Sequence, residues 1–265
     1  MPTSLSLSPD LEPLRATIEA TLQPFIKLIP HHPQEVSQLT LWQSKIGGLP
    51  YFPKNQPYPT NNRGRPLFLL AQLNFAEIPS LKGFPTTGIL QFYIADDDFF
   101  GLDFDRQTSQ QNFRVLYFPE VTPYLEPSDQ NEGHLITDFS FLPEPQYFPL
   151  STSCALQFEA GNEPVGISDY QFEKYFKEFD ESLYGEYAQY FSGDGHKLGG
   201  YASFTQEDPR TFLIEGELYR LLLQLDTDDS IDMMWGDCGV GNFFIKDEDL
   251  QNLNFSNVLY HWDCY

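Results

Sequence analysis

Two copies of one short motif constrain the fold more than any other feature of this sequence. The first copy is SKIGGLPYF at 44–52, and the second is HKLGGYASF at 196–204. Each copy places a lysine, an apolar residue and two glycines ahead of an aromatic residue. A chain that repeats such a turn is expected to repeat the β unit around it. The motif therefore predicts an internally duplicated domain, 1–265, with two pseudo-symmetric halves, 1–150 and 151–265.

A second match follows each copy of the motif at the same distance. Gln72 stands 24 residues after Gly48, and Gln224 stands 24 residues after Gly200. Each glutamine lies in an apolar stretch, LLAQLN in one half and LLQLD in the other. A buried glutamine needs partners for its carbonyl and its amide. We therefore expect both side chains to bond the backbone of the glycine turn or of the other half.

The repeated residues have both a structural and a ligand-binding interpretation. The glycine pairs give the backbone access to positive φ and so shape a tight turn. Lys45 and Lys197 occupy equivalent positions, which makes them the residues to test for contact with a ligand. The residues that we predict to contact a ligand or partner are Lys45, Gly47, Gly48, Gln72, Lys197, Gly199, Gly200, Gln224, Asp226, Trp235 and Asp237.

Strands dominate the remaining pattern, so the chain is predicted to have an α+β, β-rich fold with antiparallel or mixed sheets and a few helices. Apolar spacing predicts helices over 9–29, bent by Pro24, and over 168–191, with a capping box at Ser168 and Gln171. Short runs of aromatic and branched residues predict strands. These runs are 67–75, 88–95, 113–118, 154–159, 218–226, 241–245 and 257–262. The proline-rich stretch 120–149 is either a long connection between the halves or an extra hairpin.

These motifs resemble those of the YwqG-like family, a bacterial domain of unknown function, over nearly the whole chain. The matching segments are 44–50, 195–201, 206–210, 222–226, 234–239 and 243–245, with Ala202 where the family has proline. The glycine and LLQ elements are also distantly similar to those of programmed cell death protein 2, whose relatives are chaperones for a basic ribosomal protein. YwqG-like domains are further associated with immunity proteins. The resemblance implies a duplicated α+β fold and binding rather than catalysis.

Charge limits the classes of partner. The chain has 15 Lys and Arg residues against 38 Asp and Glu residues, a formal net charge of −23. Such a charge repels phosphate backbones and anionic lipid surfaces. The densest basic stretch is Lys45, Lys54, Arg63 and Arg65, and five prolines dilute it. We expect no nucleic-acid or membrane partner, a protein or basic peptide as the partner, and a cytoplasmic location, since no secretory signal or membrane span is evident.

No motif predicts catalysis, a metal or a cofactor. The sequence has neither a GxSxG elbow nor a phosphate-binding GxxxxGK[ST] loop. Its cysteines, Cys154, Cys238 and Cys264, lie far apart and form no CxxC pair. The predicted list of catalytic residues, metal ligands and cofactors is therefore empty.

Two acidic clusters allow more than one interpretation. They are Asp96–Asp98 with Asp103 and Asp105, and Asp226, Asp228 and Asp229 with Asp232 and Asp237. Either is a candidate for a hard cation, although solvated turns explain both. The second cluster fails the calcium-loop template.

The leading hypothesis is a non-enzymatic binding module, chaperone-like or immunity-like, in which the two halves enclose a cleft for a basic or extended polypeptide. The alternative is a small-molecule hydrolase or sugar-binding protein built on Asp226, Trp235 and Asp237.

Overall fold

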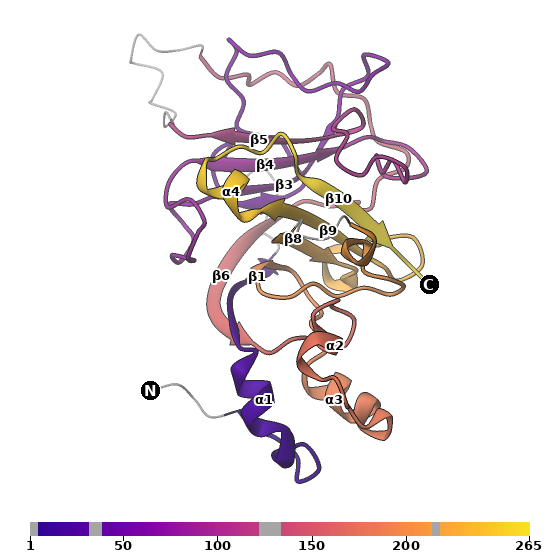
Figure 1. Cartoon of the computed structure of the whole chain (residues 1–265). Coiled ribbons are helices and arrows are strands. Elements are labelled where there is room, and N and C mark those ends of the chain that lie inside the picture. Colours follow the sequence, from indigo (N-terminus) through magenta and orange to yellow (C-terminus); the bar gives the residue numbers. More distant parts are fainter. Residues whose placement is uncertain (1–4, 32–38, 122–133, 214–217) are drawn as a thin grey trace.

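The computed structural model describes residues 5–31, 39–121, 134–213 and 218–265. Within them, ten strands form one antiparallel sheet (Figure 1). They are β1 (Gln23–His31), β2 (Lys45–Ile46), β3 (Phe68–Asn74), β4 (Ile89–Ile94), β5 (Phe113–Phe118), β6 (Cys154–Glu163), β7 (Lys197–Gly199), β8 (Tyr219–Asp226), β9 (Val240–Lys246) and β10 (Leu259–Asp263). Their order across the sheet is β10-β9-β8-β7-β1-β6-β2-β3-β4-β5. The sheet is antiparallel at every pairing, so no mixed sheet is present in the described part of the chain.

The first strand of each half crosses to the other half. β1 pairs with β6 and with β7, while β6 pairs with β1 and with β2. The strands of 1–150 and 151–265 are therefore interleaved at the centre of the sheet. Since each half completes the sheet of the other, the ten strands make one continuous structure.

The two copies of the motif pair in the same register. Lys45 of β2 lies opposite Gln72 of β3, and Lys197 of β7 lies opposite Gln224 of β8. Each half also has one register shift, at Leu69/Ala71 in β3 and at Leu221/Leu223 in β8, 152 residues apart. A bulge of this kind bends the strand and increases its twist.

Aromatic core fills the space where β4 and β5 of the first half face β9 and β10 of the second. Phe92 of β4 meets Phe243 of β9 with ring centroids 4.9 Å apart, and Phe113 of β5 meets Tyr260 of β10 at 5.2 Å. All four side chains are buried. At this position the rings of both halves leave no room for the predicted binding cleft.

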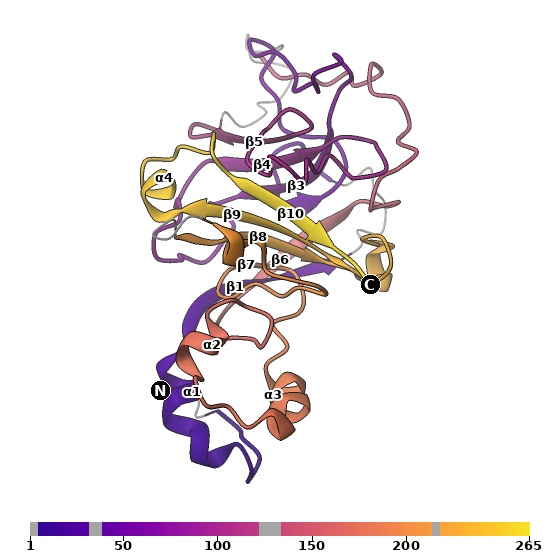
Figure 2. The ribbon, with the colours of Figure 1, turned by 45° about the vertical axis from the view of Figure 1, so that its right-hand side comes forward.

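The helices are short. They are α1 (Arg15–Ala20), α2 (Phe172–Tyr175), α3 (Tyr184–Tyr190) and α4 (Asp247–Gln251), with 3₁₀ turns η1 (Glu12–Leu14), η3 (Glu181–Leu183), η4 (Pro209–Phe212) and η5 (Asp229–Ile231). Figures 1 and 2 show α1, α2 and α3 together beyond one end of β1 and β6, while α4 lies against the sheet. The first three enclose a small aromatic core. It comprises Leu11, Ile18, Val165, Phe172, Phe176, Tyr187 and Tyr201. None of the helices described has the length and apolar character that a membrane span requires.

Both predicted helices are wrong in extent. The predicted helix over 9–29 ends at Ala20, where the Thr21 hydroxyl donates to the Ile18 carbonyl and accepts from the Val165 amide. Residues 23–31 form β1 because Pro24 has no N–H to donate and because Ile26 and Leu28 alternate into the core.

The second predicted helix, over 168–191, is broken into α2, η3 and α3. The expected capping box is absent, since the Ser168 hydroxyl accepts from the Phe204 amide instead. The aromatic side chains that suggested one amphipathic stripe fill the small core from several short turns.

The seven predicted strands coincide with β3, β4, β5, β6, β8, β9 and β10. β1, β2 and β7 were not predicted. Of the stretch 120–149, residues 122–133 lie outside the described residues. Residues 134–149 contain an isolated bridge from Leu135 to Pro53 and no strand.

Candidate functional site

The predicted residues Lys45 and Gln72 form part of a buried cluster that we call the first brace (Lys45, Gln72 and Gln91). The Gln72 side-chain amide donates to the carbonyls of Leu41 and Gln43, both at 2.8 Å, and its oxygen accepts from the Tyr51 amide at 2.8 Å. Gln72 thereby ties β3 to the backbone on both sides of the glycine turn. The bonds stay within one half.

An equivalent second brace (Lys197, Gln224 and Asn242) lies in the other half. Gln224 donates to the carbonyls of Gly193 and Gly195, both at 2.9 Å, and accepts from the Ser203 amide at 2.8 Å. Each of these partners stands 152 residues after its counterpart in the first brace. Both glutamines are fully buried, so their hydrogen bonds satisfy groups that would otherwise destabilise the fold.

The lysine of the first brace is held by carbonyls. Lys45 is 1% exposed, and its Nζ donates to the carbonyl of Thr40 at 2.6 Å, to that of Leu49 at 2.7 Å and to that of Leu41 at 3.3 Å. Burial lowers the pKa of Lys45 to about 7, and the Glu77 carboxylate raises it in part. Three carbonyls match the three donors of an ammonium group.

The lysine of the second brace is held by a carboxylate. Lys197 is 1% exposed, and its Nζ donates to both oxygens of Glu163 at 2.9 Å. Glu163 also accepts from the Tyr201 amide at 2.8 Å. Burial raises the pKa of Glu163, while Lys197 lowers it. Each lysine is therefore bonded within the chain.

The four predicted glycines shape the two turns. Gly47, Gly48, Gly199 and Gly200 have φ of +68°, +75°, +66° and +69°. A Cβ on Gly200 would lie 2.1 Å from Glu163 Oε1, whereas one on Gly48 would meet no atom closer than 3.3 Å. These positions require glycine for conformation, and at Gly200 also for space.

Asp226, Trp235 and Asp237 do not converge on a pocket. Trp235 is fully buried, with its ring centroid 5.7 Å from that of Phe100 and 6.2 Å from that of Trp262. Asp226 accepts from the Gly195 amide at 2.7 Å, and burial raises its pKa. Asp237 is exposed. A buried indole offers no face to a sugar ring.

His196 and Asp228 are paired as in a catalytic His–Asp dyad, but the histidine has no ring nitrogen free to act as a base. His196 Nε2 lies 3.2 Å from Asp228 Oδ2, and its Nδ1 accepts from the Asp226 amide at 3.0 Å. Burial lowers the pKa of His196. Since both ring nitrogens are engaged within the chain, neither is available to take a proton from a substrate.

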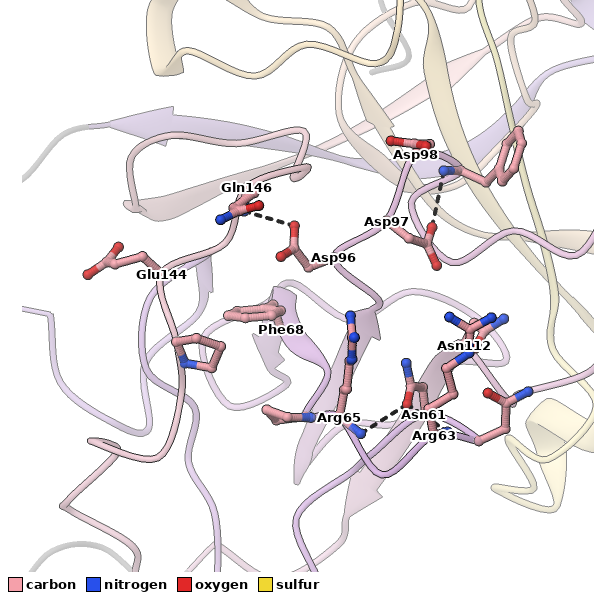
Figure 3. Close-up of a pocket in the computed structure, with 14 residues that line it drawn as sticks. Asn61, Arg63, Arg65, Phe68, Asp96, Asp97, Asp98, Asn112, Glu144 and Gln146 are labelled. Atoms are coloured by element: carbon pink, nitrogen blue, oxygen red, sulfur yellow. Dashed lines mark hydrogen bonds between the residues drawn. The ribbon is translucent and has the colours of Figure 1, made fainter.

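A cleft of about 740 Å³, which we call the Arg63–Asp98 cleft, lies entirely within the first half (Figure 3). Residues of four separate segments line it. They are Asn61, Asn62, Arg63, Arg65, Pro66, Phe68, Asp96, Asp97, Asp98, Phe99, Asn112, Pro143, Glu144 and Gln146. Figure 3 shows Arg63 and Arg65 on one side, Asp96, Asp97 and Asp98 on the other, and Phe68 between them. The cleft thus has one basic and one acidic wall.

A tight turn carries the basic wall. Asn61 Oδ1 accepts from the amides of Arg63 and Arg65 at 2.9 and 3.0 Å, and the Asn61 amide donates to the Arg65 carbonyl at 2.8 Å. Gly64 at the tip has φ of +74°. An asparagine that bonds the backbone two residues on is a strong turn former. Both arginines therefore project from a preformed hairpin tip.

The acidic wall is fixed in the same way. Asp97 Oδ1 accepts from the amides of Phe99 and Gly101 at 3.1 and 2.9 Å. Asp96 Oδ1 accepts from the amides of Gln146 and Tyr147. In both aspartates the second oxygen makes no hydrogen bond with a described residue. Asp98 is exposed and makes no described side-chain hydrogen bond.

Sequence reasoning noted both walls but did not join them. The basic stretch that includes Arg63 and Arg65 was weighed for nucleic acid and membrane surfaces, and Asp96–Asp98 was interpreted as a solvated turn or a cation site. Among the residues described, no group of three or more His, Cys, Asp and Glu side chains is arranged to hold a metal ion. The signal that could have linked the walls is the antiparallel pairing of β3 with β4, which brings the chain before β3 next to the chain after β4.

A second groove of about 410 Å³ runs along β5, the end strand of the sheet. Its walls are Arg114–Tyr117 on β5 and Leu253, Phe255 and Ser256 near β10. The Gln110 side chain already accepts from the Val115 amide at 2.8 Å and donates to the Phe255 carbonyl at 2.6 Å. Because Gln110 bonds part of this edge, the β5 groove is a weaker candidate than the cleft.

Comparison with known proteins adds a family but no activity. A search of curated proteins found no match. A family model described as a domain of unknown function, DUF1963, matches residues 44–264, which include both braces and the Arg63–Asp98 cleft. The chain belongs to the DUF1963 family.

Proposed function

We propose that the chain is a non-enzymatic binding protein that holds a short, basic segment of polypeptide in the Arg63–Asp98 cleft. The observation that carries this proposal is a cleft of about 740 Å³ whose carboxylates are fixed by backbone amides. Clefts of ~300–1,000 Å³ are typical of sites that enclose small ligands. Such a cleft suits a few residues of a peptide.

The lining residues favour binding over chemistry. They include no Ser, Thr, Cys, His, Lys or Tyr, so carboxylates are the only groups of the described wall that could act as nucleophile or base. Asn62, Asn112 and Gln146 supply amide groups that match peptide backbone, and Phe68 and Phe99 supply apolar surface. In ligand-binding sites such precisely placed polar groups fix the orientation of the ligand.

Electrostatics favour a basic partner. The net charge of −23 attracts cations over long range, and Asp97, Asp98 and Glu144 place negative charge at the cleft itself. Complementary charge raises encounter rates and is screened by salt. The alternative built on Asp226, Trp235 and Asp237 receives no comparable support, since Trp235 is fully buried.

The wider resemblance is also part of this proposal. Kinship with YwqG-like proteins and, more distantly, with programmed cell death protein 2 agrees with binding rather than catalysis. We further propose that the two halves derive from one repeated unit. The support is the constant offset of 152 residues between Lys45 and Lys197, between Gln72 and Gln224, between the two glycine pairs, and between the backbone groups that the two glutamines bond.

Retention of tetrapeptides by the full chain tests the function. Two pools are used, one with a single lysine per peptide and one with alanine in its place, and retention after ultrafiltration is measured by mass spectrometry. We expect the lysine pool to be retained at low ionic strength and released as salt is added. Asp98→Asn should weaken retention, whereas the control Asp105→Asn, an exposed residue outside the cleft, should not. Equal retention of the two pools would contradict the proposal.

A further inference from the structure

Arg63 and Arg65 differ from the other arginines of the chain. Four of the other five pair with carboxylates, and Arg114 donates to the Gln110 carbonyl. Neither Arg63 nor Arg65 makes a side-chain hydrogen bond or an ion pair with any described residue. Arg63, Arg65 and Arg114 thus have no carboxylate partner among the described residues, and of these Arg63 and Arg65 are exposed at the cleft, where a ligand can reach them.

These arginines do not close onto the opposite wall. Asp96 and Asp97 line the same cleft, yet no ion pair crosses it. The Asn61 bonds fix the turn that carries the arginines, and the Phe99 and Gly101 amides fix Asp97. Opposite charges are therefore presented to one space by two rigid loops.

This arrangement selects against ligands of a single charge sign. An anion such as phosphate would approach against the field of a chain of net charge −23 and would meet Asp97 and Asp98 in the cleft. A ligand with only positive charge would leave the guanidinium groups without a counter-charge. A ligand with both charges satisfies both walls, since guanidinium groups bind carboxylates with two parallel hydrogen bonds.

We propose that the occupant of the cleft is zwitterionic, a short peptide whose free carboxylate is bound by Arg63 and Arg65 while its cationic group lies against Asp97 and Asp98. This inference rests on the proposed function and adds to it the carboxylate as a required feature of the ligand. The carboxylate is that of a peptide C-terminus in the test below.

The test compares two pools of N-acetylated tetrapeptides that start with lysine, one with a free C-terminal carboxylate and one with a C-terminal amide. The free-acid peptides have no net charge and the amides carry +1, so net charge alone would favour the amides on this acidic chain. We expect about tenfold stronger retention of the free acids, the size of a charge-assisted hydrogen bond. The double variant Arg63→Gln/Arg65→Gln should abolish that preference.

A matched control is Arg106→Gln, because Arg106 is 64% exposed and lies outside the cleft. It should leave the preference unchanged. The charge-reversal variant Arg63→Glu/Arg65→Glu should favour the amides over the free acids. Equal retention of both pools, or a preference that survives Arg63→Gln/Arg65→Gln, would overturn the carboxylate inference and leave the binding function standing. Retention of neither pool would overturn both.

Discussion

The two halves of the molecule share their interior and differ at their surface. In both, a glutamine ties one strand to the same positions around a glycine turn. The lysines beside these glutamines are stabilised differently, Lys45 by three carbonyls and Lys197 by Glu163. The same arrangement of strands, glycine turn and glutamine therefore accommodates two different sets of partners for a buried lysine.

The arginines show the opposite contrast. In the second half Arg210 is buried, with Asp169 and Asp208 at 2.7 Å and the rings of Tyr170 and Phe244 at 4.7 and 4.5 Å. In the first half Arg63 and Arg65 are exposed at a cleft. The comparison indicates that the braces hold the fold, while the loops between the strands determine which charged side chains stay exposed, as we propose for ligand binding at the cleft.

The largest effect should come from the brace lysines. Lys197→Met leaves the Glu163 carboxylate buried without its partner and should cost about 3–5 kcal/mol in the free energy of unfolding. Lys45→Met leaves three carbonyls without a donor and should cost about 1–3 kcal/mol. Urea unfolding of both variants measures the difference. A negligible change in the free energy of unfolding for both variants would favour the original prediction that these lysines contact a ligand.

Substitutions in the glycine turns should likewise destabilise the fold more in the second half than in the first. Gly200→Ala places a Cβ against Glu163 and forces the carboxylate away from Lys197, at a cost of about 2–4 kcal/mol. Gly48→Ala brings a Cβ no closer than 3.3 Å to Ser153, so its cost, about 1–2 kcal/mol, should come mainly from the positive φ. Thermal and urea unfolding give both values. A larger loss for Gly48→Ala would reverse the comparison.

The pH dependence of stability should reveal the lowered pKa of Lys45. Because burial lowers the folded-state pKa of Lys45 to about 7, the unfolded chain binds more protons between that pH and its ordinary value near 10.4. The free energy of unfolding should therefore rise with pH over that range, by up to about 1.4 kcal/mol per unit. Lys45→Met should lack this rise. The check is the difference between wild type and variant at pH 7 and 9.5, and a difference that shrinks as pH rises would contradict the assignment.

The smallest effect on stability is expected at the cleft. Arg63→Gln/Arg65→Gln removes two exposed side chains without described partners and should change the free energy of unfolding by less than about 0.5 kcal/mol. Thermal unfolding measured beside that of Arg106→Gln provides the check. A loss comparable to that of Lys197→Met would mean that the arginines support the fold instead of a ligand.

Sequence reasoning recovered the parts of the fold that local pattern controls. The runs around Gln72 and Gln224 form strands as predicted. Aromatic and branched side chains favour strands because they pack well on the pleated surface of a sheet. The equal spacing of glycine and glutamine predicted two equivalent turns, and the two glutamines do bond the backbone around them.

The failures came from contacts distant in sequence. Residues 23–31 have a helical spacing of apolar side chains, yet they pair with β6 more than 120 residues away. The Lys197 partner, Glu163, lies on that same distant strand. The cleft was missed for the same reason, since Arg65 and Asp97 meet only after β3 and β4 pair.

The most direct test of the central claim is an amide NMR titration of the full chain with the free-acid tetrapeptide pool. If the cleft binds and the braces support the fold, chemical-shift changes should concentrate at 61–65, 96–99 and 144–146 and leave Gly47, Gly48, Gly199 and Gly200 unmoved. Changes centred on the four glycines, with the cleft unaffected, would contradict the account.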